Sequence, residues 1–400
     1  MKKIGFISPW YGENITGGAE AALRGLVHHM TDQNVELEIL TTCVKDFTSD
    51  WNQNFHKKGL TEEYGIPVRR FPVRKRNTAL FNEINYKFVY HQRVTEQEEE
   101  IFLREMVNSP ELYAYIKEHQ DEYSALVYTP YMFGTTYYGA LACPEKTVLI
   151  PCLHDEGYAY MKHFAEAFSK VRGMLYLSEP ERELANRLYD LSRVKQMTIG
   201  TGVDVSYSGN GEAFRKKYQI KEPFIVYAGR KDEGKNILTL LRYFEEYKKR
   251  RGGDLKLVLL GGGNLEVPKE SRKEILDLGF VSKEDKFDAC AACEFLCQPS
   301  KNESFSIVIM ESWIAGRPVL VHNDCAVTKN FAIQARGGLY FKDYYEFEGC
   351  VDYFSEHKDV AAEMGQNGRA YVLDHFEWGV IVQKTLAFLE ECMQEKEQAS

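Results

Sequence analysis

The chain has 400 residues, of which 44% are hydrophobic, and it carries a formal net charge of −9 at pH 7. This length favours two domains with separate cores, and the negative charge argues against a general nucleic-acid-binding protein. Met1-Lys2-Lys3 leads directly into an apolar strand, so we expect neither a secretion signal nor a membrane span. The nine cysteines, including the isolated pair Cys290 and Cys293, are expected to be reduced thiols of a cytoplasmic protein.

The N-terminal elements form a strand, a loop with two glycines and a helix. The pattern predicts a strand from Ile4 to Ser8, and Gly17 and Gly18 open a helix that runs to about Met30. Doubly wound folds bind a phosphate or a sugar at such a position. A tight turn without a ligand explains the glycine pair equally well.

The segment from 44 to 123 is the hardest to interpret. Its most distinctive part is a basic run within the sequence IPVRRFPVRKR, and a helical pattern follows from about Tyr86 to His119. The run is either a solvated loop or edge strand, or a surface for an anionic partner such as lipid headgroups or the phosphates of a lipid-linked acceptor. Its cations are Arg69, Arg70, Arg74, Lys75 and Arg76.

His154 follows the apolar stretch from Lys146 to Leu153, which we predict to be a strand. It therefore lies at the carboxyl edge of the predicted sheet, where open parallel sheets bind ligands. A single histidine is more often a structural hydrogen-bonding group than a reagent, so position alone leaves both interpretations open.

A polar stretch from Ser206 to Gly211 indicates a domain boundary near residue 205. The second domain then opens with a strand from Phe224 to Ala228 and a loop that contains Arg230 and Lys235. The planar fork of arginine together with the point charge of lysine suits a pyrophosphate leaving group. The alternative is two exposed basic residues without a ligand.

The stretch from Leu296 to Val321 predicts a strand, a turn, a helix and a second strand. Glu303 and Glu311 are expected at the two ends of the helix, about 12 Å apart, which is too far for both to act on one glycosidic bond. They suit an extended ligand whose anionic middle lies over the free N–H groups of Ser304 to Ile307, as a nucleotide-sugar would. The alternative is a surface helix with two solvated glutamates.

The pattern E-x7-E followed by A-G-x-P-V resembles the signature of the retaining family-4 glycosyltransferases, also called glycosyl transferases group 1. The G-R-x4-K element at Arg230 and the turn Gly200-Thr201-Gly202-Val203-Asp204 resemble the same family. Serines at 304 and 306 and Asn236 stand where the family usually has glycines.

This resemblance implies an α/β protein of GT-B architecture, with two Rossmann-like doubly wound domains facing a cleft. Residues 1–205 would bind the acceptor, residues 206–376 would bind the nucleotide-sugar, and a C-terminal helix at about 377–400 would cross back to the first domain. His154 and Glu303 would be catalytic residues that contact the donor sugar. The donor-binding residues would be Gly17, Gly18, Arg230, Lys235, Ser304, Phe305, Ser306 and Glu311.

The resulting functional prediction is a retaining hexosyltransferase that moves a sugar from a nucleotide-diphosphate donor to a saccharide or lipid-linked acceptor in surface-glycan biosynthesis. We expect no cofactor and no metal, because the chain lacks an Asp-x-Asp pair. The basic run would add a peripheral contact with the inner membrane surface. The alternatives are a catalytically silent partner subunit, and a sugar-nucleotide epimerase or a phosphorylase with the same fold.

Overall fold

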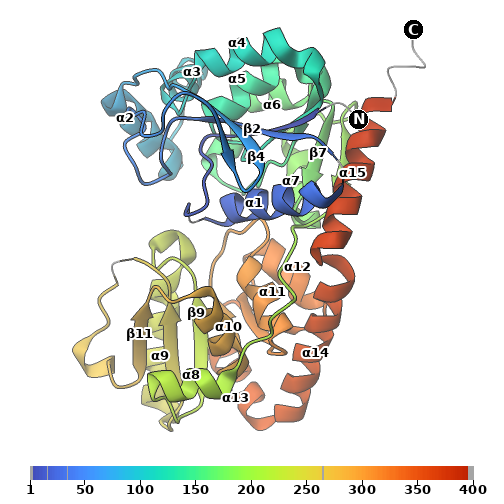
Figure 1. Cartoon of the computed structure of the whole chain (residues 1–400). Helices are drawn as coiled ribbons and strands as arrows, with labels where there is room; N and C mark the ends of the chain where they lie inside the picture. The colour runs from blue at the N-terminus through green and yellow to red at the C-terminus, as the bar shows by residue number, and fades with distance from the viewer. Residues whose placement is uncertain (1–2, 16, 34, 264, 395–400) are drawn as a thin grey trace. The chain divides into compact units, whose positions relative to one another are not determined.

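The computed structural model describes residues 3–15, 17–33, 35–263 and 265–394. The chain divides into two compact units, one formed by Met1–Gly202 together with Trp378–Ser400, the other by Val203–Glu377. The sequence placed the boundaries at 205 and 377. The colours of Figure 1 show the chain leaving the first unit and returning to it with its last helix.

One sheet forms the centre of the first unit, with the strand order β3-β4-β2-β1-β5-β6-β7-β8. Neighbouring strands are parallel except β3 and β4. Because the order runs outward from β1 in both directions, a topological switch point lies between β1 and β5. The strands are β1 (Lys3–Ser8), β2 (Leu37–Thr42), β3 (Gly59–Glu63), β4 (Ile66–Phe71), β5 (Tyr123–Tyr128), β6 (Thr147–Leu149), β7 (Gly173–Tyr176) and β8 (Lys195–Thr198).

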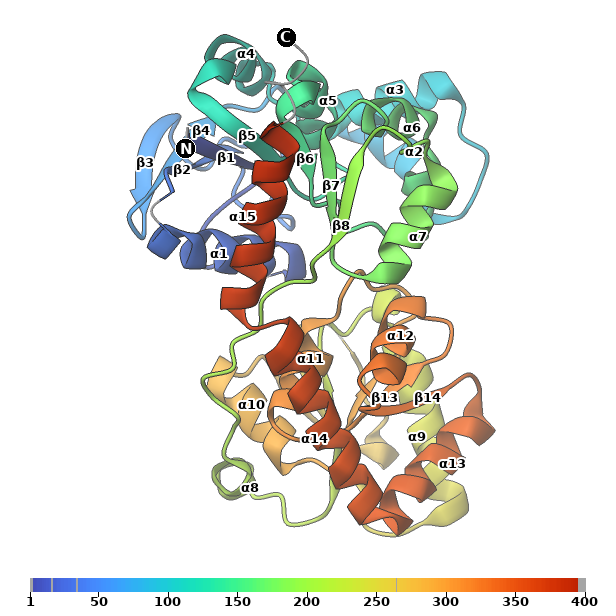
Figure 2. The ribbon, with the colours of Figure 1, turned by 90° about the vertical axis from the view of Figure 1, so that its right-hand side faces the viewer.

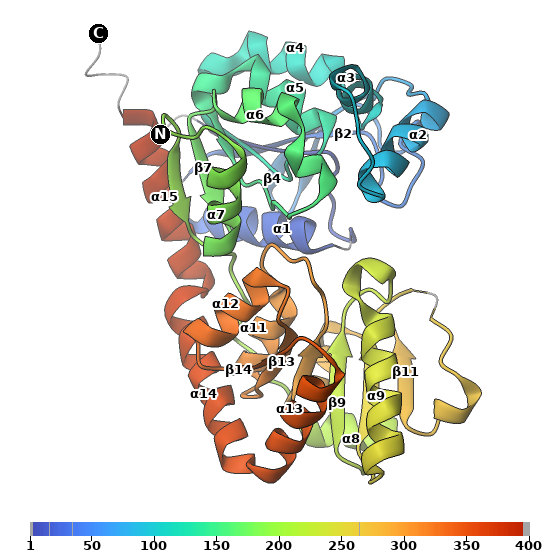
Figure 3. The same ribbon diagram turned by 180° about the vertical axis from the view of Figure 1, so that it is seen from behind.

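Helices cover both faces of this sheet, which explains why β2 is buried along its whole length. Figures 1 and 3 show α4, α5 and α6 on one face and α1 on the other. The helices are α1 (Gly18–Met30), α2 (Thr78–Val89), α3 (Glu96–Glu105), α4 (Pro110–His119), α5 (Gly134–Ala142), α6 (Lys162–Phe168), α7 (Glu179–Leu188) and α15 (Trp378–Gln394).

The C-terminal helix α15 completes the first unit by packing beside α1 (Figure 2). The indole ring of Trp378 stacks on the ring of His29, with 4.7 Å between the centroids. A Cβ at Gly25 would lie 2.1 Å from the Trp378 ring, and a Cβ at Gly202 would lie 2.0 Å from it. Both positions therefore need glycine for α15 to pack here.

The second unit has a parallel sheet with the strand order β11-β10-β9-β12-β13-β14, so its switch point lies between β9 and β12. Figure 3 shows α9 and α13 on one face, and Figure 2 shows α10, α11 and α14 on the other. The strands are β9 (Phe224–Ala228), β10 (Lys256–Leu260), β11 (Ile275–Gly279), β12 (Leu296–Gln298), β13 (Val319–His322) and β14 (Gly338–Phe341). The helices are α8 (Gly211–Tyr218), α9 (Ile237–Arg251), α10 (Lys283–Ala292), α11 (Ile307–Ile314), α12 (Ala326–Gln334), α13 (Tyr344–Glu356) and α14 (Lys358–His375).

Three predicted elements differ in the structure. The strand before His154 ends at Leu149, and the expected helix from Tyr86 to His119 is three helices, α2 to α4. Helix α11 begins at Ile307 and not near Ser304. Glu303 therefore precedes the helix, and the 12 Å helical separation from Glu311 was wrong.

Within the described part of the chain, none of the helices combines the length and the apolar composition needed to span a bilayer.

Candidate functional site

In the second unit, the predicted site residues gather where β9 and β12 end. The loop after β9 carries Arg230 and Lys235, and the loop after β12 carries Glu303 to Ser306. These two strands flank the switch point, where adjacent loops diverge and leave room for a ligand. The chain therefore brings two distant segments to one edge of the sheet.

Lys235 and Glu303 form the central contact of this site. Lys235 Nζ lies 2.7 Å from Glu303 Oε1, and the side chains are 24% and 10% exposed. Asp232 accepts a hydrogen bond from the backbone N–H of Lys235 at 3.1 Å and so caps the short helical turn that presents the lysine. The ammonium group of Lys235 is thus held at the sheet edge against a carboxylate that has little contact with water.

Arg230 is more accessible than Lys235. Its guanidinium Nε lies 2.9 Å from Asp232 Oδ2, but the side chain is 68% exposed. The ring hydroxyl of Tyr227 donates to the backbone carbonyl of Arg230 at 2.5 Å, which fixes the main chain and leaves the side chain movable. An exposed salt bridge of this kind is weak, so an anionic ligand can compete for the guanidinium.

Asn236 and Ser306 both have positive φ angles, of 56° and 77°. These are two of the positions at which the resembling family usually has glycine, and the left-handed region explains that preference. Asn236 tolerates the region and anchors it, because its Nδ2 donates to Pro299 O at 3.0 Å. Ser306 has no such anchor: its Oγ is buried and has no hydrogen-bond partner among the described residues.

Glu311 is buried on α11 and is held by a lysine that the sequence analysis missed. Lys286 Nζ, on α10, donates to Glu311 Oε1 at 2.6 Å. The other carboxylate oxygen, Oε2, is buried without a partner in the described part of the chain. Unsatisfied buried acceptors destabilise a protein by about 1–3 kcal/mol, so a hydroxyl group that reached this oxygen would gain a hydrogen bond at little further desolvation.

The segment between the two glutamates is less uniform than predicted. The ring of Phe305 is buried against Phe331 and Phe376, with centroid distances of 5.1 and 5.0 Å, so only its backbone can face a ligand. Ser304 is half-buried in the loop. Because α11 starts at Ile307, the free N–H groups of its first turn begin there, after the loop and not within it.

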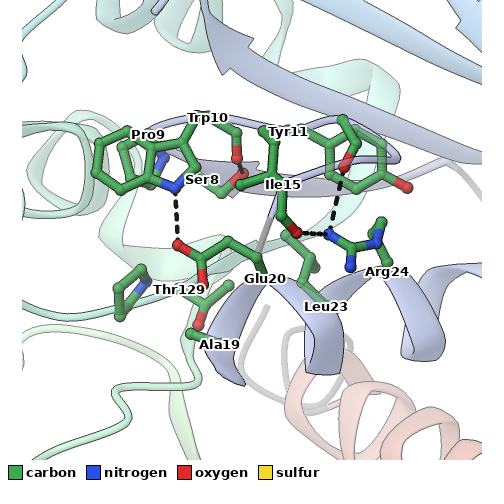
Figure 4. Close-up of a pocket in the computed structure, with 12 residues that line it drawn as sticks. Ser8, Pro9, Trp10, Tyr11, Ile15, Ala19, Glu20, Leu23, Arg24 and Thr129 are labelled. Atoms are coloured by element: carbon green, nitrogen blue, oxygen red, sulfur yellow. Dashed lines mark hydrogen bonds between the residues drawn. The ribbon is translucent and has the colours of Figure 1, made fainter. Parts of the chain in front are cut away.

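In the first unit, a small pocket lies at the switch point between β1 and β5 (Figure 4). Trp10 Nε1 donates to Glu20 Oε1 at 2.8 Å, and Arg24 Nη1 donates to Ile15 O at 2.8 Å. Gly17 has a φ of 148°, and a Cβ there would lie 2.0 Å from Glu20 Oε2. The absence of a side chain at Gly17 therefore leaves room for the Glu20 carboxylate beside the backbone. Gly17 was predictable from the sequence, but the pocket was not. Its lining consists of Ser8, Pro9, Trp10, Tyr11, Gly12, Ile15, Ala19, Glu20, Leu23, Arg24, Thr129 and Pro130.

Gly18 and His154 also belong to the first unit. Gly18 is the first residue of α1, and a Cβ there would meet nothing within 4 Å, so no close contact requires glycine at this position. His154 lies in the loop after β6, with its Nδ1 3.6 Å from Glu156 Oε1. Its side chain is half-buried, and β6 lies between β7 and β5, the end of which borders the pocket.

Most of the basic run is bonded within the first unit. Arg69 pairs with Glu38 at 2.8 Å, Arg70 is only 3% exposed and pairs with Glu63, and Arg74 pairs with Glu105 at 2.7 Å. The guanidinium of Arg76 lies over the rings of Trp51 and Phe81. Of the predicted cations, Lys75 is the exposed one. Arg69 and Arg70 lie on β4, which is paired with β2 on one side and β3 on the other, so they are not on an edge strand, whereas Arg74, Lys75 and Arg76 lie in the loop that follows β4. Because most of its charges are paired, the run offers little free charge to a membrane.

Among residues 3–15, 17–33, 35–263 and 265–394, no three or more His, Cys, Asp or Glu side chains form a group that could hold a metal ion.

Solved structures share this fold over nearly the whole chain. Sucrose-phosphate synthase from Thermosynechococcus elongatus matches with a TM-score of 0.72 at 14% identity, over 98% of this chain and 99% of that chain. Anabaena HepE in complex with UDP-glucose matches with a TM-score of 0.68 at 16% identity, over 98% and 100%. WaaG, a glycosyltransferase involved in lipopolysaccharide biosynthesis, matches with a TM-score of 0.65 at 14% identity, over 96% and 99%. The fold is therefore the GT-B fold of glycosyltransferases.

Sequence comparison identifies the second unit more closely. Residues 210–371 match the family described as glycosyl transferases group 1. The chain is also 38% identical over 109 residues to the N-acetylgalactosamine-N,N'-diacetylbacillosaminyl-diphospho-undecaprenol 4-alpha-N-acetylgalactosaminyltransferase of Campylobacter jejuni. That match covers 26% of this chain and 28% of the relative.

Proposed function

We propose that the protein transfers a sugar from a nucleotide-diphosphate donor to a saccharide or lipid-linked acceptor, with retention of anomeric configuration and without a metal ion. The observation that carries the proposal is the contact between Lys235 and Glu303 at the switch point of the second unit. This pair would supply a cation for the diphosphate beside a carboxylate for the sugar hydroxyls, and it lies within the segment that matches the group 1 glycosyl transferases.

The donor groups would be divided between the charged residues of the second unit. Lys235 and Arg230 neutralise the diphosphate, whose negative charge grows as the sugar departs. Glu303 accepts hydrogen bonds from sugar hydroxyls, and the unpartnered oxygen of Glu311 accepts one from the ribose. The N–H groups at Ile307 add the partial positive charge of a helix N-terminus.

Retention would follow from a substitution on one face of the sugar, in which the departing phosphate takes the proton of the acceptor hydroxyl. Glu303 is engaged by Lys235, so it is better suited to hold hydroxyl groups than to attack the sugar. His154, from the first unit, orients the sugar and stabilises the positive charge that develops on it. No step in this scheme calls for a metal, because cationic side chains supply the charge on the diphosphate.

The acceptor would bind at the pocket of the first unit, where Glu20 can accept a hydrogen bond from a hydroxyl and the Trp10 ring offers an apolar face. The names of two similar proteins support acceptors of surface glycans: a diphospho-undecaprenol transferase and a protein of lipopolysaccharide biosynthesis. With a lipid-linked acceptor, the protein would reach the inner membrane surface through its substrate. The basic run, whose charges are mostly paired, would contribute little.

A donor panel tests the proposal. UDP-sugars are the first choice, since HepE binds UDP-glucose. Each donor is incubated with and without diphospho-undecaprenol saccharides, with excess chelator present, and the product anomer is determined by NMR. Transfer with retention is expected. An epimerised donor without acceptor would identify an epimerase, donor binding without any product would identify a silent partner, and loss of activity restored by magnesium or manganese would refute the metal-free scheme.

A further inference from the structure

The carboxylate of Glu181 is buried in the first unit and has no direct part in the proposed binding of donor or acceptor. Only 1% of the residue is exposed. Its Oε1 accepts a hydrogen bond from the Leu153 N–H at 2.6 Å, and its Oε2 accepts one from the Leu177 N–H, also at 2.6 Å. Glu181 is on the first turn of α7, so one side chain ties the loop after β6 to the end of β7.

The tied peptide lies immediately before His154. On the other side of the histidine, Asp155 is held by Arg187 Nη2 at 2.7 Å and by the Tyr160 hydroxyl at 2.6 Å. Glu181 and Arg187 both belong to α7. The residues that flank His154 are therefore both fastened to the same helix.

The loop needs such restraint, because its backbone is unusual two residues before His154. Cys152 has a φ of 54°, in the left-handed region that non-glycine residues occupy at a cost of about 1–2 kcal/mol. Left to itself, the segment would relax toward ordinary backbone angles. The charge-assisted hydrogen bond to the Leu153 N–H opposes this relaxation from the adjacent residue.

We propose that Glu181 is a positioning residue for His154, whose carboxylate holds the Leu153 peptide so that the imidazole stays in place for the donor sugar. The role at the sugar rests on the proposed function, whereas the control of the His154 loop does not depend on it. Arg187 supports the same loop from the far side, through Asp155.

Protonation of Glu181 would weaken this link. Burial raises the pKa of Glu181 to about 7, although the N–H groups of Leu153 and Leu177 and the neighbouring His154 act in the opposite direction. Cys152 and Tyr176 are further titratable groups close to this carboxyl. Since a carboxylate accepts both N–H bonds while a carboxylic acid turns one oxygen into a donor, the double link is complete only above about pH 7.

The same group affects stability in the opposite sense. Its pKa in the folded protein lies above the ordinary value of 4.5, so the folded state binds the proton more tightly than the unfolded state does. This contribution to stability is fully present below about pH 4.5 and is lost as pH rises through about 7. As pH rises through about 7, the His154 loop should therefore be held more firmly while the free energy of unfolding falls. A carboxyl with only a structural role would not produce these two opposite changes.

The test compares Glu181→Gln with the matched control Glu183→Gln, an exposed position on the same helix. The ring resonances of His154, assigned with His154→Gln, are followed by NMR from pH 5.5 to 8.5. In the wild type and the control we expect these resonances to show an inflection near pH 7 that reports Glu181. Glu181→Gln should lose this inflection, because its amide cannot ionise and presents N–H donors to one of the two peptide N–H groups.

Kinetics provide the second measurement. Glu181→Gln should lower kcat at least tenfold while the donor KM changes less than twofold, and its kcat should no longer rise through pH 7. If this variant does not fold, Glu181→Asp keeps the charge and should show the inflection together with a reduced kcat. An unchanged pH dependence of the His154 resonances in the folded variant would overturn the proposal. A lower melting temperature without any change in these resonances would overturn it as well. Should the wild type transfer no sugar, the proposed function fails and the NMR titration alone decides the role of Glu181.

Discussion

Replacing Lys235 with methionine separates the stabilising and the catalytic contributions of the Lys235–Glu303 contact. Methionine keeps much of the apolar stem and removes the charge, which leaves the Glu303 carboxylate unpaired at 10% exposure. A hydrogen bond between charged groups at 2.7 Å contributes about 1.5–3 kcal/mol. In a domain of this size, that loss lowers the melting temperature by about 3–12 °C.

Turnover should fall further than this loss of stability suggests. If Lys235 neutralises the departing diphosphate, removing one such charge lowers kcat by about 10²–10³, with a smaller loss of donor affinity. The double variant Lys235→Met/Glu303→Gln removes the unpaired carboxylate as well. We expect it to regain most of the lost melting temperature, because a buried pair can be replaced by neutral groups at little cost, and to regain none of the turnover.

The assay combines thermal unfolding, calorimetric titration of the donor and single-turnover kinetics on the wild type and these variants. Lys301→Met is the control, since Lys301 lies in the adjacent loop and forms an exposed ion pair with Asp324 at 3.5 Å. It should match the wild type in turnover and melt within about 0.5 kcal/mol of it. A Lys235→Met enzyme with wild-type turnover, or a double variant that recovers turnover with its stability, would refute the role of the lysine in catalysis.

Three further predictions concern other contacts of the two units. Glu311→Gln should weaken UDP binding at least tenfold in calorimetry, and Lys286→Met should weaken it through Glu311, whereas Lys283→Met on the same helix should not; equal effects from both lysines would contradict the ribose contact. Hydrogen bonds from Lys283 and Ser206 lower the pKa of Asp204 to about 2. Asp204→Asn should therefore lower the free energy of unfolding by about 1 kcal/mol at pH 7. Urea unfolding should show that this difference vanishes as pH falls from about 4 toward 2. Trp10→Phe, which removes the donor to the pocket carboxylate, should raise the acceptor KM several-fold and leave UDP binding unchanged; a weaker UDP affinity instead would assign the pocket to the donor.

Elements that depend only on residues close together in the sequence were predictable. The strand at Ile4 to Ser8, the helix that ends at Met30 and the strand Phe224–Ala228 follow from runs of apolar residues and from glycine at the helix start, and the structure confirms them within one residue. The switch-point position of Arg230 and Lys235 was predictable for the same reason, because a loop after a buried parallel strand has a known place in the sheet.

Features that depend on distant residues were not predictable. The late start of α11 follows from the positive φ of Ser306, which no propensity of serine indicates. Lys286 pairs with a glutamate 25 residues away, and nothing in its own helix distinguishes it from Lys283. The pairing of the basic run was not predictable, because its carboxylate partners come from other elements: Glu38 from β2, Glu63 from β3 and Glu105 from α3.

The contact of Trp378 with Gly25 and Gly202 has a consequence for biosynthesis. The first unit lacks its last helix until the ribosome has translated all of Val203–Glu377, which takes roughly 10 to 35 seconds at about 5–20 residues per second. During that interval the second unit, whose chain is continuous, can fold, while the surface of the first unit beside α1 stays uncovered. Premature termination before Trp378 would therefore release a chain whose damage lies in its N-terminal half, where chaperones and proteases would recognise the exposed surface that α15 normally covers.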